Sequence, residues 1–79
     1  MKAELDVITI TIRKGADEEW PSGHEQLVLS DAVEREFEVI EISEPYSSGT
    51  WSFIMRERNH RAVVRRINEL IRECTGKET

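Results

Sequence analysis

Apolar and polar residues alternate strictly near the start of the chain. In residues 5–13, isoleucine stands at the even-numbered positions 8, 10 and 12, and valine or threonine stands at the odd-numbered ones. These residues are Ile8, Ile10 and Ile12, and Val7, Thr9 and Thr11. A period of two is the pattern of a β-strand with one strongly apolar face. Valine and threonine also favour strands without needing burial. We therefore predict a strand here whose second face is either solvated or covered by another subunit.

The next segment combines turn residues with a short apolar run. Residues 14–24 contain two glycines, a proline and three acids and predict a loop. Residues 25–29 (EQLVL) predict a second, shorter strand. Residues 30–36 (SDAVERE) fit a turn or two of helix, because Asp31 with Glu34 resembles a capping box and Ser30 is also a suitable cap. A plain connection between strands is the alternative.

Two further strands flank a loop in the middle of the chain. Residues 37–43 (FEVIEIS) are strand-like, but their apolar residues switch from odd-numbered to even-numbered positions. This switch indicates a bulge near Val39 or Ile40, or burial of both faces. Residues 44–50 (EPYSSGT) predict a hairpin loop. Residues 51–56 (WSFIMR) resume a strand with Trp51, Phe53 and Met55 on one face.

The last part of the chain predicts a long amphipathic helix. Asn59 is a good N-cap for a helix that runs to about Cys74, and Gly76 is placed to end it in a left-handed conformation. At 100° per residue the apolar side chains fall in one arc, which predicts a stripe facing the core. Its members are Val63, Val64, Ile67, Leu70, Ile71 and Cys74.

These elements predict one small α+β domain over residues 1–79. The expected architecture is a three- to four-stranded antiparallel sheet with one long C-terminal helix on one face, and a short helix after the second strand. In outline it resembles the open sandwiches of ferredoxin-like and ACT-type domains. The balance of 38% hydrophobic and 34% charged residues is typical of a globular domain. Cys74 is the only cysteine, which excludes an internal disulfide, and no apolar run is long enough for a membrane helix. A cytoplasmic location is therefore expected.

Charge reverses sign along the chain. Residues 1–54 carry four basic and twelve acidic side chains, a net charge of −8, whereas residues 55–79 carry seven basic and four acidic ones, a net charge of +3. Basic side chains crowd the expected start of the helix, where the helix dipole disfavours cations. They are Arg56, Arg58, His60 and Arg61.

An anion near the helix start would offset this crowding. One candidate is a bound phosphate or carboxylate. The other is the chain's own Glu36, Glu38 or Glu41.

Arg61, Arg65 and Arg72 share one exposed flank of the helix, opposite Arg66, Glu69 and Glu73. A basic stripe beside strand aromatics such as Trp51, Phe53 and Tyr46 would suit RNA or another phosphate ligand. The overall charge of −5 argues against this, because nucleic-acid-binding domains are usually basic. The abundance of acids suits a third hypothesis, an inhibitor that imitates a polyanion.

Trp20 lies in the acidic loop, after Asp17, Glu18 and Glu19 and before Pro21. Such a tryptophan either folds back to close the end of the core or stands out as an anchor for a partner.

Residues with catalytic or metal-binding chemistry are sparse. His24, His60 and Cys74 match no zinc spacing, no serine or cysteine stands beside a positioned base, and no glycine-rich loop follows a strand. We expect no enzyme, metal or cofactor.

The favoured hypothesis is a non-catalytic binding or regulatory module that acts through a protein partner. We expect it to form a homodimer through an open sheet face or an edge strand, because the pattern predicts Val7, Val28 and Ile54 on the face opposite the isoleucines. The residues expected to meet a partner or an anion are Arg56, Arg58, His60, Arg61, Arg65, Arg72 and Trp20.

Overall fold

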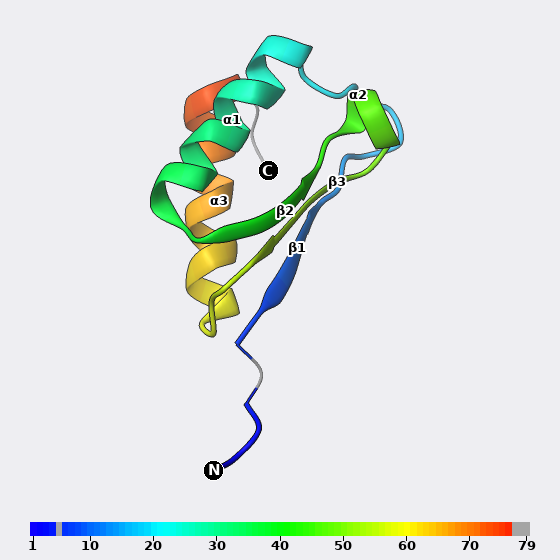
Figure 1. The fold of residues 1–79 in the computed structure, drawn as a ribbon. Helices are drawn as coiled ribbons and strands as arrows, with labels where there is room; N and C mark the ends of the chain where they lie inside the picture. The colour runs from blue at the N-terminus through cyan, green and yellow to red at the C-terminus, as the bar shows by residue number, and fades with distance from the viewer. Residues whose placement is uncertain (5, 77–79) are drawn as a thin grey trace.

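The computed structural model describes residues 1–4 and 6–76, apart from the side chains of residues 46 and 47 (Figure 1). The elements follow in the order β1 (Ile8–Ile12), α1 (Gly23–Glu36), β2 (Val39–Ser43), α2 (Pro45–Ser48), β3 (Trp51–Met55) and α3 (His60–Thr75). Apart from the single turn α2, this is the order of the first five elements of the ferredoxin-like β-α-β-β-α-β motif. The α+β class with a long C-terminal helix is confirmed.

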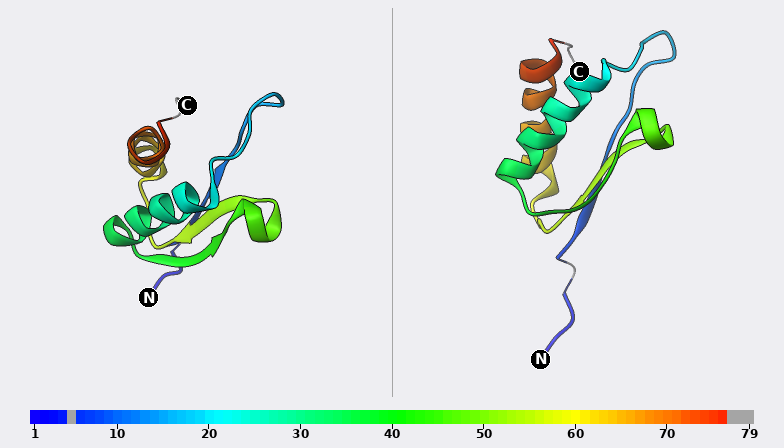
Figure 2. Two further views of the ribbon diagram at one scale, coloured as in Figure 1. Left: turned by 90° about the horizontal axis from the view of Figure 1, so that it is seen from above. Right: turned by 45° about the horizontal axis from the view of Figure 1, so that its top comes forward.

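The three strands form one antiparallel sheet in the order β1-β3-β2. The last strand in the chain therefore lies in the middle, and β1 and β2 are both edges. Helices α1 and α3 lie side by side on the same face of the sheet, and the other face is uncovered (Figure 2). Two helices rather than one cover the sheet, because one of the expected strands is helical.

The prediction of a strand at residues 25–29 is wrong, since these residues lie in α1. The helix begins at Ser22, whose hydroxyl accepts a hydrogen bond from the Glu25 N–H at 3.2 Å while the Glu25 carboxylate accepts one from the Ser22 N–H. This capping box starts the helix one residue before Gly23. Neither Ser30 nor Asp31 is a cap, and Ser30 is buried inside the helix. Helix in residues 30–36 is confirmed as the second half of α1.

A bulge interrupts β2 where the apolar residues switch from odd-numbered to even-numbered positions. Val39 pairs with Met55 and Glu41 with Ile54, so Ile40 is the extra residue. The bulge returns Ile42, which pairs with Phe53, to the same face as Val39. The predicted bulge is confirmed. The loop that follows contains the single turn α2, which ends at Gly49 with a φ of 75° that favours glycine.

Helix α3 has the predicted caps. The Asn59 Oδ1 accepts a hydrogen bond from the Ala62 N–H at 3.2 Å, and Gly76 ends the helix with a φ of 71°. The Gly76 N–H donates a hydrogen bond to the Arg72 carbonyl at 3.0 Å. The predicted stripe faces the core except at its margins, where Val64 is 40% exposed and Cys74 is half-buried.

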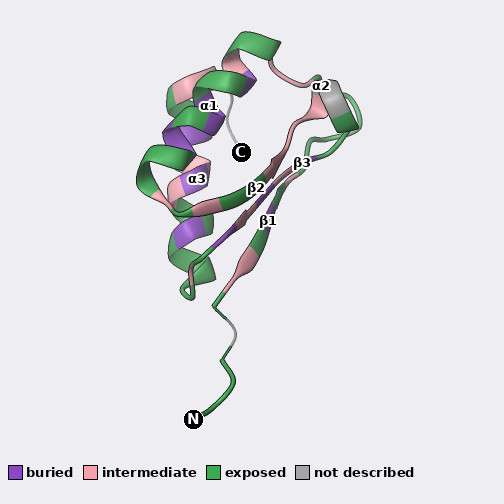
Figure 3. Ribbon diagram, in the orientation of Figure 1, coloured by how far each residue is buried: buried purple, intermediate pink, exposed green. Residues whose placement is uncertain are grey.

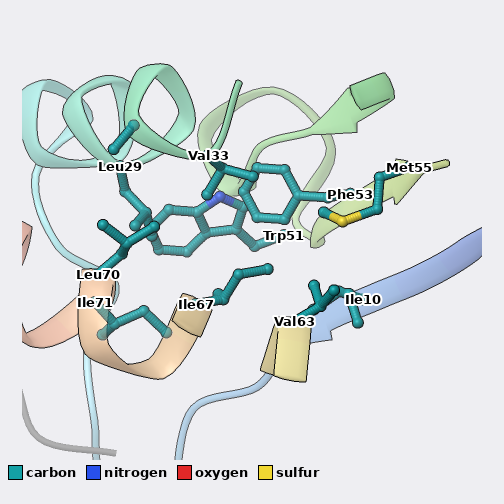
Figure 4. Packing of buried hydrophobic residues seen from close by; sticks show 11 residues of the cluster. Ile10, Leu29, Val33, Trp51, Phe53, Met55, Val63, Ile67, Leu70 and Ile71 are labelled. Atoms are coloured by element: carbon teal, nitrogen blue, oxygen red, sulfur yellow. The ribbon is translucent and has the colours of Figure 1, made fainter. Parts of the chain in front are cut away.

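The core lies between the sheet and the two helices (Figure 3). Trp51, Phe53 and Met55 of β3 point into it, and the Trp51 indole lies between α1 and α3 (Figure 4). The buried apolar residues are Ile10, Leu29, Ala32, Val33, Trp51, Phe53, Met55, Val63, Ile67, Leu70 and Ile71.

The uncovered face of the sheet is mostly polar. The register puts hydroxyl and carboxylate side chains there together with one large apolar residue: Thr9, Thr11, Glu41, Ser43, Ser52 and Ile54. Val28, expected on this face, lies on α1 instead. The expectation of apolar residues on the second face therefore holds for Ile54 but is wrong for Val28, and a further exposed apolar side chain, Ile40, lies at the bulge of β2.

Candidate functional site

Two of the arginines before α3 are compensated within the chain. Arg56 binds Asp6 (Nη1 to Oδ2, 3.1 Å) and approaches Glu38 (Nε to Oε1, 3.6 Å). Arg58 binds Glu4 (Nη2 to Oε2, 2.7 Å). The acids come mainly from the segment before β1, and of the three expected glutamates only Glu38 contributes here. These exposed pairs are individually weak, but they neutralise two of the cations that crowd the helix start.

Arg66 joins the two helices. Its Nε and Nη2 donate to the two carboxylate oxygens of Glu36 at 2.7 and 2.8 Å, and its Nη1 donates to Glu69 at 3.0 Å. This two-point contact is the strongest geometry for an arginine and a carboxylate. The hydrogen bonds from Arg66 hold the pKa of Glu36 below its ordinary value.

The other flank of α3 carries three exposed arginines, Arg61, Arg65 and Arg72. Among the described residues, no carboxylate forms an ion pair with any of them. His60 is also exposed, at the first position of the helix. The residues expected to form a partner site are thus divided. Arg56 and Arg58 form ion pairs within the chain, whereas Arg61, Arg65 and Arg72 face solvent.

A groove opens beside these arginines, between β1 and α3. Its floor is the outer side of β1, from Thr9 to Ile12, and its wall on α3 is formed by Val64, Ile67, Asn68, Ile71 and Thr75. The groove has a volume of about 350 Å³. Isoleucine and valine side chains on both sides make it largely apolar, and the partial exposure of Val64 is explained by its position on the rim.

Trp20 closes one end of the groove. It is half-buried and packs edge to face against Trp51, with the ring centroids 5.8 Å apart. The Lys14 ammonium lies 5.8 Å from the centre of its ring. Trp20 therefore closes the end of the core and is at the same time a wall of the groove.

The backbone of β1 presents hydrogen-bonding groups to the groove that have no strand partner among the described residues. The Arg56 N–H donates to the Glu38 carbonyl of the β2 side at 2.9 Å, so the even-numbered residues of β3 face β2 and the odd-numbered ones face β1. Met55, Phe53 and Trp51 pair with Ile8, Ile10 and Ile12, which therefore bond to β3. By alternation, the N–H and C=O groups of Thr9 and Thr11 point outward, along the floor of the groove.

The strand aromatics Trp51 and Phe53 are unavailable for stacking on a nucleic-acid base. Trp51 is 2% exposed and Phe53 is fully buried, so neither can stack on a base. Tyr46, the third aromatic considered, has its side chain outside the described residues. Stacking of the kind used by RNA-binding sheets would need exposed aromatic side chains on the open face.

Other chemistry is weakly represented. Within residues 1–4 and 6–76, no group of three or more His, Cys, Asp or Glu side chains is placed to hold a metal ion. Burial raises the pKa of the Cys74 thiol, with a smaller contribution from the neighbouring Glu73 carboxylate, which makes it a poor nucleophile. None of the described helices is long and apolar enough to cross a membrane.

The sequence pattern gave little sign of the groove. Its floor was visible as an alternating strand, but the edge position of β1 depends on the strand order, which the mistaken strand at residues 25–29 obscured. Val64 lay at the margin of the apolar stripe and was the one local signal.

No protein-family model, curated protein or solved structure matches this chain.

Proposed function

We propose that this protein is a non-catalytic binding module that accepts an extended segment of a partner protein as an added strand along β1, beneath α3. The observation that supports this most strongly is the outward row of main-chain groups at Thr9 and Thr11 on the floor of an apolar groove. An extended backbone satisfies such a row, and its alternate side chains fill the adjoining pocket.

The contrast between the two edges of the sheet supports the same site. Natural proteins protect edge strands with charges, prolines or bulges, which prevent unwanted pairing. The β2 edge has such protection, because it contains the bulge at Ile40 and the charge of Glu41. Strand β1 (ITITI) has no charge, proline or bulge. An edge left open in this way is suited to a specific partner.

The apolar side chains of the groove lie along the length of β1. The apolar side chains of an added strand would alternate toward Val64, Ile67 and Ile71 and continue the row of Ile8, Ile10 and Ile12. Burial of apolar surface contributes roughly 25 cal/mol per Å², so a few side chains in the groove supply much of a micromolar affinity.

Selection of binding peptides tests the proposal. A phage-displayed library of random nine-residue peptides is selected on the folded protein, and the enriched peptides are measured against Val64→Arg and Ile40→Arg. Both substitutions replace an exposed apolar side chain, 40% and 51% exposed, but only Val64 lines the groove. We expect peptides with alternating apolar residues that lose at least about tenfold in affinity on Val64→Arg and none on Ile40→Arg, as for a lost contact worth about 1.4 kcal/mol.

Three outcomes would contradict the proposal. In the first, no peptide is enriched. In the second, the enriched peptides bind Val64→Arg and Ile40→Arg equally, which would place the binding surface elsewhere. The third is a stable dimer in sedimentation equilibrium that Val64→Arg dissociates. In that case the groove would be occupied by a second copy of this chain.

A further inference from the structure

The helix that forms one wall of the groove carries an exposed basic flank, although the chain has a net charge of −5. Arg13 and Lys14 line the groove just beyond the end of β1. Arg61, Arg65 and Arg72 lie on the solvent-exposed flank of α3, outside the lining itself. Glu18 and Glu19 are the carboxylates of the groove lining, both at the Trp20 end. The Glu18 carboxylate accepts a hydrogen bond from the Gly15 N–H within its own loop, at 2.9 Å.

Two of the four arginines of α3, Arg61 and Arg65, stand at energetically unfavourable positions, whereas Arg72 lies in the last turn, where the helix dipole favours a cation. Arg61 and Arg65 are four residues apart on a helix, a spacing at which like charges destabilise by a few tenths of a kcal/mol. Arg61 also lies in the first turn, where the helix dipole disfavours a cation. Arg66, by contrast, is neutralised by Glu36 and Glu69. Among the described residues, nothing compensates Arg61, Arg65 and Arg72 in this way.

Their spacing matches an extended chain in the groove. Arg61 and Arg72 are eleven positions apart, or about 16 Å along a helix at 1.5 Å per residue. An extended strand covers the same distance in about five residues at 3.3 Å per residue. Strand β1 itself has five residues. A strand added to β1 would therefore be about as long as this row of arginines on the neighbouring helix.

We infer that the partner segment is acidic, with carboxylate side chains that alternate with its apolar ones or flank them. This inference rests on the proposed function and specifies its partner. The apolar side chains enter the groove, and the carboxylates meet the arginines of α3, with Arg13 and Lys14 at the end of the strand. Charge-assisted hydrogen bonds from arginine would fix the register of the segment as well as its affinity.

Three synthetic peptides separate the inference from the proposed function. Each has eight residues, with valine at alternate positions and glutamate, serine or lysine between them, and binding is followed by fluorescence anisotropy. We expect the glutamate peptide to bind at least about tenfold more tightly than the serine peptide, and the lysine peptide to bind most weakly. The advantage of glutamate should shrink in about 1 M salt, where the screening length falls to about 3 Å.

Substitutions on the protein locate the charges. The triple variant Arg61→Gln, Arg65→Gln, Arg72→Gln should remove the difference between the glutamate and serine peptides and leave the affinity for the serine peptide unchanged. The single variants Arg61→Gln and Arg35→Gln are a matched pair, since each removes one exposed guanidinium from a helix. Only Arg61→Gln should weaken binding of the glutamate peptide.

Each other outcome has a definite meaning. If the three peptides bind equally, the inference fails and the proposed function stands. If none binds while the selected peptides also fail, the proposed function is wrong. If a single-stranded oligouridylate binds more tightly than the glutamate peptide and the triple arginine variant abolishes that binding, the flank serves nucleic acid and the inference is overturned.

Discussion

The indole of Trp20 meets that of Trp51 edge to face, with an angle of 72° between the rings. This contact joins the loop after β1 to the largest buried side chain of β3. The same loop closes the end of the groove, so the shape of the binding site depends on a contact of the core.

Removal of the Trp20 ring should lower the stability of the protein and remove the side chain that closes one end of the groove. We expect Trp20→Ala to reduce the free energy of unfolding by about 1–3 kcal/mol, less than for a fully buried tryptophan because Trp20 is only half-buried. Trp20→Phe should lose a smaller amount, since it keeps an aromatic edge. Urea unfolding followed by circular dichroism measures both. An unchanged midpoint for Trp20→Ala would show that the ring stands away from the core.

The helical state of α1 predicts unequal effects at two neighbouring leucines. Leu29 is fully buried and Leu27 is 47% exposed, whereas in a strand the two would share one face. Leu29→Ala should destabilise by about 2–5 kcal/mol and Leu27→Ala by less than about 1 kcal/mol. Equal losses in chemical denaturation would instead support the strand that the sequence pattern indicates.

The elements with conventional patterns were predictable. Helix α3 has a cap at each end and an uninterrupted apolar stripe, β3 alternates regularly, and the parity change in residues 37–43 revealed the bulge. The first half of α1 was missed because two positions of its buried face are polar, Gln26 and Ser30. The remaining apolar residues resembled a short strand, and the capping box at Ser22 lay inside a segment rich in turn residues.

Contacts between distant residues were beyond any local pattern. Asp6 and Arg56 are separated by 50 positions, and Glu4 and Arg58 by 54. Which arginines are neutralised depends on these pairings, and they decide which basic side chains remain available. The expectation of internal compensation was reasonable from the charge reversal, but the acids before β1 could not be chosen over those of residues 36–41 without the fold.

The N-cap of α3 offers a direct measure of local stability. Asn59→Ala removes the acceptor for the Ala62 N–H, which should cost about 1 kcal/mol, while Asn59→Asp keeps an acceptor and should retain most of the stability. Thermal unfolding by circular dichroism measures both variants. Equal melting temperatures for the alanine variant and the unmodified protein would argue against the cap.

The contact between Arg66 and Glu36 should make stability depend on pH. Because the pKa of Glu36 is lowered in the folded protein, its contribution is present above the pKa of the unfolded chain, near 4.3 for an ordinary glutamate, and is lost as pH falls through the folded value. Arg66→Gln should therefore lower the melting temperature at pH 7 but progressively less below about pH 4. A constant difference across this range would show that the ion pair contributes nothing.

Cys74 should react slowly in the native protein. Its pKa is raised by burial and by Glu73, so little thiolate is present near neutral pH. Alkylation by iodoacetamide at about pH 8, followed by mass spectrometry, should be markedly slower in the folded protein than in urea. Glu73→Gln should accelerate it modestly. Native and unfolded rates that coincide would place the thiol fully in solvent.

Amide hydrogen exchange of the isotope-labelled protein tests the central claim most directly, with and without the peptide that alternates valine and glutamate. Thr9 and Thr11 donate outward from β1, and Ile42 donates outward from the opposite edge by the same alternation. Addition of the peptide should slow exchange at Thr9 and Thr11 and leave Ile42 unchanged. Saturating peptide that leaves exchange at Thr9 and Thr11 unaltered would contradict strand addition along β1.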